Sequence, residues 1–268
     1  MKLLQKIAVV VLMLFAVSCE KYFDYSPYAI RFEEESQDLN NKNIFLIKSR
    51  EESDTLRIAF TGDSHNYFDE LGLFVEKANS LTNIDFVIHV GDIADFGLPK
   101  QYSWGNGYLS QLNQPYLVLI GNHDLVGNGL EAYNEMFGVL DFSFIYDQIK
   151  FIFLNTNSLE FANNGTVPDL SWLKEELKPS AEFSSAAIIC HVPPNDADFD
   201  SNLEAEFYQT ISTYHNVLMV VHGHQHHHEI YYPTADSIPF INVYGVEHRM
   251  MNTIEIVQNQ IHVKNVSF

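Results

Sequence analysis

Five histidines lie within seven positions of the stretch VHGHQHHHE, residues 221–229. A histidine-rich tract binds metal ions loosely through its composition alone. It becomes part of a defined site only if distant parts of the chain supply further ligands. The rest of the sequence therefore decides between three readings: a solvated polar run, a weak metal-binding tract, or one corner of an active site.

Five short apolar runs are each followed by residues that can bind a metal ion. The runs are LRIAF (56–60), FVIHV (86–90), YLVLI (116–120), AAIIC (186–190) and VLMVV (217–221). The residues that follow them, in the same order, are Asp63 and His65, Asp92 and Asp95, Asn122, His123 and Asp124, His191, and His224 and His226. If the runs are strands of an α/β sheet, these residues lie at the carboxyl ends, where such sheets bind ligands. A glycine precedes the first candidate ligand in four of the five exits, which allows a sharp turn and a close approach of the backbone.

The ligand types are carboxylate, amide oxygen and imidazole, with no thiolate among them. This set favours Mn, Fe or Zn over a thiolate-selecting centre. Seven ligands are too many for one tetrahedral zinc ion. They suit two divalent or trivalent ions that share a bridging ligand, about 3.5–4 Å apart. In an extended chain the middle residue of D-x-H and H-x-H would place both ligands on one side.

The apolar runs alternate with segments of helical periodicity, which is typical of an α/β fold. Apolar residues recur at helical spacing over 71–81 and over 203–214. The second stripe follows a capping-box pattern that runs from Ser201 to Glu204. A further helix is expected at 170–179, where Pro179 stops it.

Strands are expected elsewhere in the same part of the chain. Residues 142–155 predict two strands around a tight turn, and 229–245 and 253–268 predict further β-hairpins. The continuous apolarity of the five runs indicates strands that are covered on both faces. One packing that satisfies this order is two sheets face to face with helices outside.

The motifs D-x-H, G-D-x-x-D, G-N-H-D, a lone His after a strand, and G-H-x-H follow one another between residues 63 and 226. In this order they resemble the calcineurin-like metallophosphoesterase superfamily. The resemblance implies an α/β fold in which a two-sheet β sandwich is flanked by helices, in four layers (α/β/β/α). It also implies roles for the individual residues. Asp63, His65 and His226 would hold the first ion, and Asn122, His191 and His224 the second. Asp92 would bridge both ions. His123 would act on the substrate, and Asp95, or less favourably Asp124, would orient it.

The activity implied is hydrolysis of a small-molecule phosphomonoester or phosphodiester by a metal-bridging hydroxide. His123 would donate a proton to the leaving oxygen. Two branches of the superfamily are disfavoured by departures from their patterns. Protein serine/threonine phosphatases carry Arg where this chain has Phe96, and purple acid phosphatases carry a Tyr ligand where it has Asp95.

The other histidines are expected to be structural or peripheral. His222 precedes the glycine of G-H-x-H and is expected to support the site without binding metal, whereas His227 and His228 are expected at a solvated rim. His89 lies inside an apolar run and is expected in the core, as is Cys190, which should point away from its neighbour His191. Arg249 and Tyr244 are candidates to reach a substrate from the last hairpins.

Three other functions stay open: a nuclease of the same superfamily, a dinuclear amidohydrolase or peptidase, and a non-enzymatic metal-binding surface lipoprotein. With 15 basic residues against 35 acidic ones, the formal charge of −20 gives no basic footprint, so no nucleic-acid partner is expected. The Asn within G-N-H-D speaks against an amidohydrolase. An intact His123 beside a full ligand set speaks against a protein that only sequesters metal.

The N-terminal residues resemble a bacterial lipoprotein signal. Lysines 2 and 6 precede an apolar run of 11 residues, 7–17, which has the length of a secretory core and is too short to span a membrane. The sequence AVSC then ends at Cys19, the expected lipidated first residue. The expected organisation is a signal at 1–18, a tether and lead-in at 19–54, and a metallophosphoesterase domain at 55–268. The protein would be exported and lipid-anchored to a bacterial membrane, on the periplasmic side or at the cell surface; an ordinary cleaved signal is the alternative.

Overall fold

The computed structural model describes residues 5, 26–51, 53–233, 235 and 238–268. The expected lipidation site Cys19 and, apart from Gln5, the expected signal lie outside the described residues. Within the described part of the chain, no helix combines the length and apolarity needed to cross a membrane.

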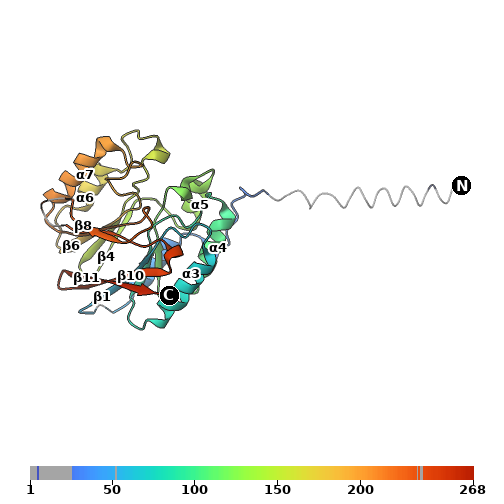
Figure 1. The fold of residues 1–268 in the computed structure, drawn as a ribbon, viewed down its shortest axis with the longest axis horizontal. Coiled ribbons are helices and arrows are strands. Elements are labelled where there is room, and N and C mark those ends of the chain that lie inside the picture. Colours follow the sequence, from blue (N-terminus) through green and yellow to red (C-terminus); the bar gives the residue numbers. More distant parts are fainter. Residues whose placement is uncertain (1–4, 6–25, 52, 234, 236–237) are drawn as a thin grey trace.

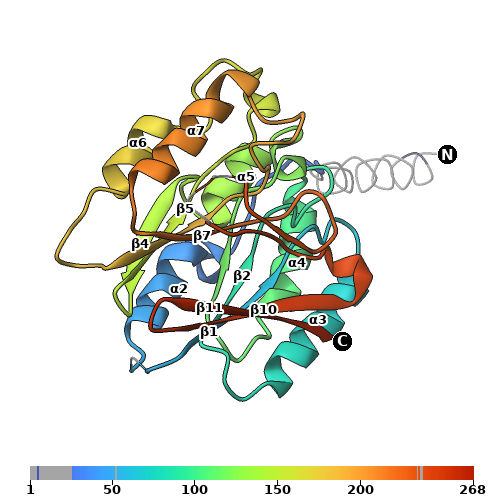
Figure 2. The same cartoon turned by 60° about the vertical axis from the view of Figure 1, so that its left-hand side comes forward.

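Two β-sheets form the centre of the molecule (Figures 1 and 2). The first sheet contains, from edge to edge, β11 (Gln260–Ser267), β10 (Met250–Val257), β1 (Leu56–Thr61), β2 (Phe86–His89) and β3 (Tyr116–Val118). The second contains β4 (Phe142–Tyr146), β5 (Ile149–Phe153), β6 (Ser185–Ile189), β7 (Val217–His222), β9 (Phe240–Asn242) and β8 (Glu229–Tyr231). All five apolar runs of the sequence form strands, and the predicted hairpins are present as β4–β5, β8–β9 and β10–β11.

The strands that carry the candidate ligands are parallel within each sheet. β1, β2 and β3 are parallel neighbours in the first sheet, as are β6 and β7 in the second. Parallel neighbours end at the same edge of a sheet, so the residues after these strands are gathered there.

Three layers of apolar side chains hold the structure together. Between the sheets, Phe86 packs edge-on against Phe144 and Phe151 within a cluster to which both sheets contribute. The outer face of the first sheet is covered by α3 (Phe68–Ser80), α4 (Pro99–Leu109) and α5 (Gly129–Met136). The outer face of the second is covered by α6 (Leu170–Glu176) and α7 (Ser201–Thr213), which Figure 2 shows on the far side from α3 and α4. The predicted α/β/β/α sandwich is confirmed.

Helix α2 (Leu39–Lys48) lies in the segment expected to be a tether and lead-in, and it packs against the edge strand β3. The side chain of Asn40 donates to the carbonyl oxygen of Val118 at 2.9 Å and accepts from its N–H at 2.9 Å. A side-chain amide thus satisfies backbone groups that an edge strand leaves open. Four short 3₁₀ helices complete the structure: η1 (Glu34–Ser36), η2 (His123–Leu125), η3 (Leu159–Phe161) and η4 (Val246–His248).

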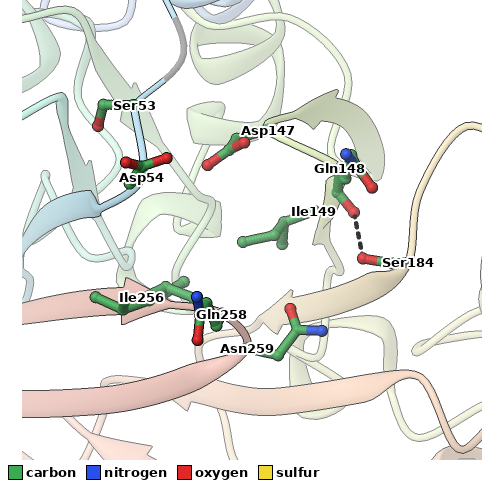
Figure 3. A pocket seen from close by; sticks show the side chains of 10 residues that line it. Ser53, Asp54, Asp147, Gln148, Ile149, Ser184, Ile256, Gln258 and Asn259 are labelled. Atoms are coloured by element: carbon green, nitrogen blue, oxygen red, sulfur yellow. Dashed lines mark hydrogen bonds between the residues drawn. The ribbon is translucent and has the colours of Figure 1, made fainter.

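A polar cavity of about 590 Å³ lies at the amino ends of the strands (Figure 3). Its walls include Asp54, which precedes β1, and the turns Asp147–Gln148 and Gln258–Asn259 of two hairpins. The cavity is therefore at the opposite end of the sheets from the predicted ligands, and it has no histidine in its lining.

The start of α7 differs from the predicted capping box. The side chain of Asp200 accepts the N–H of Asn202 at 3.0 Å and is the N-cap, whereas Ser201 is already inside the helix. The pattern Ser201–Glu204 was therefore wrong by one residue. The competing Asp was better placed because its carboxylate is a strong acceptor for first-turn N–H groups.

We expect Asp200→Ala to lower the free energy of unfolding by about 0.5–2 kcal/mol, because the substitution removes this acceptor. Ser201→Ala is the matched control and should change it by less than about 0.5 kcal/mol, because that side chain is exposed and makes no cap bond. Urea unfolding followed by circular dichroism measures both. If Ser201→Ala lowered the free energy of unfolding more than Asp200→Ala does, Ser201 and not Asp200 would be the N-cap.

Candidate metal centre

Residues from both sheets meet around one group of ligand atoms. His191, after β6, places Nε2 at 3.3 Å from Oδ2 of Asp92 and 3.1 Å from Oδ1 of Asn122. His224, after β7, places Nδ1 at 3.1 Å from the same Asn122 oxygen. Two segments of the first sheet and two of the second therefore converge on one point.

A second group of ligand atoms lies beside the first. His226 places Nε2 at 3.4 Å from Oδ1 of Asp63 and 3.4 Å from Nε2 of His65. His65 Nε2 is also 3.7 Å from Asp92 Oδ2, the oxygen that faces His191. The structure thus brings the seven predicted ligands together, with Asp92 near histidines of both groups that the resemblance implied.

The spacing of these atoms can be compared with that around a bound cation. Ligand atoms about 2.0–2.2 Å from one ion lie roughly 3–3.5 Å from their neighbours. The donor–donor distances of 3.1–3.7 Å described above are close to this range. The buried Oδ2 of Asp63 has no hydrogen-bond partner in the described structure. Carboxylate, amide oxygen and imidazole are the donors such ions accept, so the residues fit a pair of metal ions.

The pKa shifts of the buried ligands also indicate a site that needs positive charge. Burial alone would raise the pKa of Asp92, but His191, His65 and His123 hold it well below its usual range. Burial alone would lower the pKa of His191, but Asp92 and Asp63 raise it. Burial raises the pKa of Asp63. Two buried carboxylates so close together need positive charge beside them, which either protons or metal ions can provide.

The backbone at the ligands is left-handed, not extended. The φ values are 51° at Asp63, 43° at His65, 59° at Asp92, 71° at His224 and 57° at His226. The expectation that D-x-H and H-x-H share a face through strand alternation was therefore wrong, because β1 ends at Thr61 and β7 at His222. Left-handed non-glycine residues cost roughly 1–2 kcal/mol each and persist at functional sites where the surrounding structure imposes them.

Two glycines allow the loops to come together. Gly91 has a φ of 108°, and a Cβ there would lie 2.5 Å from Nδ1 of His191. A Cβ on Gly121 would lie 2.1 Å from Oδ1 of Asp92. The expected close approach of the backbone at these exits is present.

His123 lies beside the ligands with its side chain 44% exposed. Its Nδ1 is 3.2 Å from Oδ1 of Asp95 and 3.0 Å from the backbone oxygen of the same residue. The ring is 4.6 Å from that of His65 and can meet a molecule that approaches from solvent. Asp95 is thus placed to orient His123.

Asp124, the alternative partner for His123, is used differently. Its buried carboxylate accepts the backbone N–H groups of Asp92, Ala94 and Gly121 at 2.9, 2.8 and 2.9 Å. These bonds hold the loop that presents Asp92. Asp124 thus fixes the backbone around Asp92 and does not orient His123.

His89 and His222 are buried as expected. His89 Nε2 is 2.9 Å from the hydroxyl of Ser64, and His222 Nε2 is 3.1 Å from the hydroxyl of Tyr231. Burial lowers the pKa of each histidine to about 3, so both are neutral.

One expectation about the rim was wrong. His228 is half-buried, with Nδ1 2.8 Å from the oxygen of Asn242, so it is a packed residue; His227 is exposed as expected. Arg249 pairs with Glu70 on α3 at 3.1 Å instead of facing the ligands. Tyr244 packs against the rings of His228 and His248.

The sequence did not reveal three carboxylates that contact the H-x-H histidines. Glu247 lies 2.7 Å from Nδ1 of His226, and Asp196 and Asp198 lie 3.4 and 3.5 Å from Nε2 of His224. None of the three belongs to a spaced motif. They reach the site through loops whose paths only the folded chain defines.

Residues 56–228 match the family model described as calcineurin-like phosphoesterase. A protein of Fibrobacter succinogenes named as a probable cyclic nucleotide phosphodiesterase is 24% identical over 211 residues, 68% of this chain and 77% of that protein. A protein of Xenorhabdus bovienii with the same description is 29% identical over 90 residues, so the match spans only 34% of either chain.

Solved structures share the fold. A dimetal phosphatase from Danio rerio superposes with a TM-score of 0.64 at 13% identity, over 79% of this chain and 96% of that one. A purple acid phosphatase from yellow lupin, Lupinus luteus, superposes with a TM-score of 0.61 at 12% identity, over 81% of this chain and 52% of that one.

We expect Gly121→Ala to lose most of the bound metal and to lower the free energy of unfolding by about 1–3 kcal/mol, because the added methyl group overlaps the Asp92 carboxylate. Gly107→Ala, in α4, is the control: its Cβ would meet nothing within 4 Å. Elemental analysis after dialysis against Mn²⁺ measures the metal. Equal metal content in the two variants would show that the position of Asp92 does not control binding.

Proposed function

The chain belongs to the calcineurin-like phosphoesterase family, and on this premise we propose that it hydrolyses small-molecule phosphodiesters at a centre of two metal ions. One observation carries the proposal: Oδ2 of Asp92 faces His65 of one ligand group and His191 of the other. Asp92 would therefore help to hold both ions, which would supply Lewis acidity at this point.

The proposed ligands divide as the family resemblance implies. Asp63, His65, Asp92 and His226 would hold one ion, and Asp92, Asn122, His191 and His224 the other. When bound, such ions supply Lewis acidity toward phosphoryl oxygens and toward water. The donor types suit Mn, Fe or Zn.

The chain itself orders the groups around this centre. The other oxygen of Asp92, Oδ1, accepts the backbone N–H of His123 at 2.9 Å, which leaves Oδ2 for the ligand side. Because Nδ1 of His123 faces Asp95, the remaining ring nitrogen is available to a substrate. With Nδ1 held by Asp95, that remaining nitrogen could carry the proton that the leaving oxygen needs. General acid help of this kind contributes about 10²–10⁴-fold.

The charge around the site favours a diester over a monoester. Two divalent ions would bring four positive charges, and Asp63 and Asp92 would cancel two of them. Further carboxylates lie within reach of the histidines, namely Asp95, Asp196, Asp198 and Glu247. Among the described residues, no Lys or Arg forms an ion pair with any of these groups. A singly charged diester is therefore better tolerated than a doubly charged monoester.

Exposed apolar side chains follow three of the ligand-bearing strands. Tyr67, Phe96 and Val126 are 46%, 55% and 45% exposed, and they come shortly after His65, Asp95 and His123 along the chain. Such side chains can cover the apolar or aromatic part of a leaving group. The relatives named as cyclic nucleotide phosphodiesterases support a nucleoside as that part.

The test is a substrate panel with Mn²⁺, Fe²⁺ or Zn²⁺ restored to the metal-free enzyme. We expect turnover of bis(4-nitrophenyl) phosphate and of cyclic nucleotides, with a higher kcat/KM than for 4-nitrophenyl phosphate. In Asp92→Asn, activity and metal should be lost together. In His123→Ala, kcat should fall about 10²–10⁴-fold with metal retained.

The outcomes separate the competing functions. A higher kcat/KM for the monoester would contradict the proposal that the carboxylates around the site favour a singly charged diester. Digestion of single-stranded DNA would indicate a nuclease. Cleavage of peptides or amides would indicate an amidohydrolase. Metal uptake with no turnover of any ester would indicate a metal-binding protein.

We also propose that the protein is exported and lipid-anchored through Cys19, as the N-terminal pattern suggests. The described domain begins at Ser26, a few residues beyond that cysteine, so acyl chains there would hold the centre close to a membrane surface. Expression in a bacterial host with an alkyne fatty acid should label the wild type and leave Cys19→Ser unlabelled. Equal labelling of both would support the ordinary cleaved signal.

A further inference from the structure

Glu247 contacts the centre from outside the part of the chain that matches the family model, which ends at residue 228. It lies in η4, between β9 and β10. Its Oε1 is 2.7 Å from Nδ1 of His226, a hydrogen-bond distance. The other nitrogen of that ring, Nε2, faces Asp63 and His65 at 3.4 Å each.

Backbone contacts fix the segment that carries Glu247. A Cβ on Gly245 would lie 2.3 Å from Oε2 of Glu247, so a larger residue there would displace the carboxylate. The N–H of Val246 donates to the oxygen of Gly62 at 3.1 Å, and Gly62 and Gly245 form a parallel bridge. Because Gly62 precedes Asp63, η4 is fastened directly beside one of the ligands that His226 faces.

The contact that Glu247 gives His226 differs from the one that supports His191, a histidine of the other group. His191 donates from Nδ1 to the backbone oxygen of Val90 at 2.8 Å, a neutral acceptor. A carboxylate acceptor makes an imidazole a stronger donor to a metal ion than a carbonyl oxygen does.

We propose that Glu247 is a positioning residue that fixes the proton of His226 on Nδ1 and so presents Nε2 to the ion held with Asp63 and His65. The inference rests on the proposed two-ion centre. On this proposal η4, the segment directly before the C-terminal hairpin β10–β11, helps to build the centre.

The test compares Glu247→Gln with a control on β10, the strand that follows η4. Glu255→Gln is suitable because Glu255 pairs with Arg57 and Lys264, away from the centre. Metal-free protein is titrated with Zn²⁺ by calorimetry. For Glu247→Gln we expect one of the two ions to bind about 10–100-fold more weakly and the other to change little. Glu255→Gln should match the wild type at both sites.

A second measurement needs no variant. In Zn²⁺-loaded wild type, long-range ¹H–¹⁵N spectra of the histidine rings should show the proton of His226 on Nδ1. A proton on Nε2 would overturn the proposal, as would wild-type affinities in a folded Glu247→Gln protein. If Glu247→Gln does not fold, the spectra alone decide. A wild type that takes up fewer than two ions would instead refute the two-ion centre itself.

Discussion

The structure depends on the burial of one carboxylate between two sheets. Asp92 is 1% exposed and lies at the point where loops from β1, β2, β3, β6 and β7 meet. An isolated charge is very unfavourable in such a place and persists only with partners. Imidazoles on two sides, the N–H of His123 and the convergent carboxylate of Asp63 make the position one that cations stabilise. The seam between the sheets is therefore suited to bind cations at this point, whereas elsewhere it is filled by the apolar core.

Holding that carboxylate requires local conformations that the chain does not favour. Five of the seven proposed ligands have left-handed backbones. The parallel strands behind them, buried on both faces, supply the packing that imposes these turns. Asp124 does the same at close range, because three N–H groups of two loops converge on its carboxylate. The packing of the strands thus stabilises the left-handed backbone of the ligand residues at their ends.

Much of this could be predicted from the sequence, because apolar runs and motif spacing are local signals. The five strands, the sandwich and the convergence of the ligands follow from them. The left-handed backbone through which D-x-H places both side chains on one side could not be predicted, because the sequence does not show where β1 ends. The cap of α7 was misplaced by one residue, since Asp200 and Ser201 are both good caps and only geometry separates them. Glu247, Asp196 and Asp198 were missed because a carboxylate that supports a histidine has no fixed distance from it along the chain.

The acidity of the whole protein and its proposed attraction for a phosphate ester are compatible because they act over different ranges. Charges separated by more than about 8–10 Å are largely screened at physiological salt, so most of the net charge of −20 has little effect on a molecule at the centre. A substrate of the proposed centre would meet the balance between two ions and the carboxylates that surround them. The carboxylates that contact His123, His224 and His226 would also reduce the positive field. Precise placement of the ligands and the proposed preference for a singly charged substrate would thus have one physical cause.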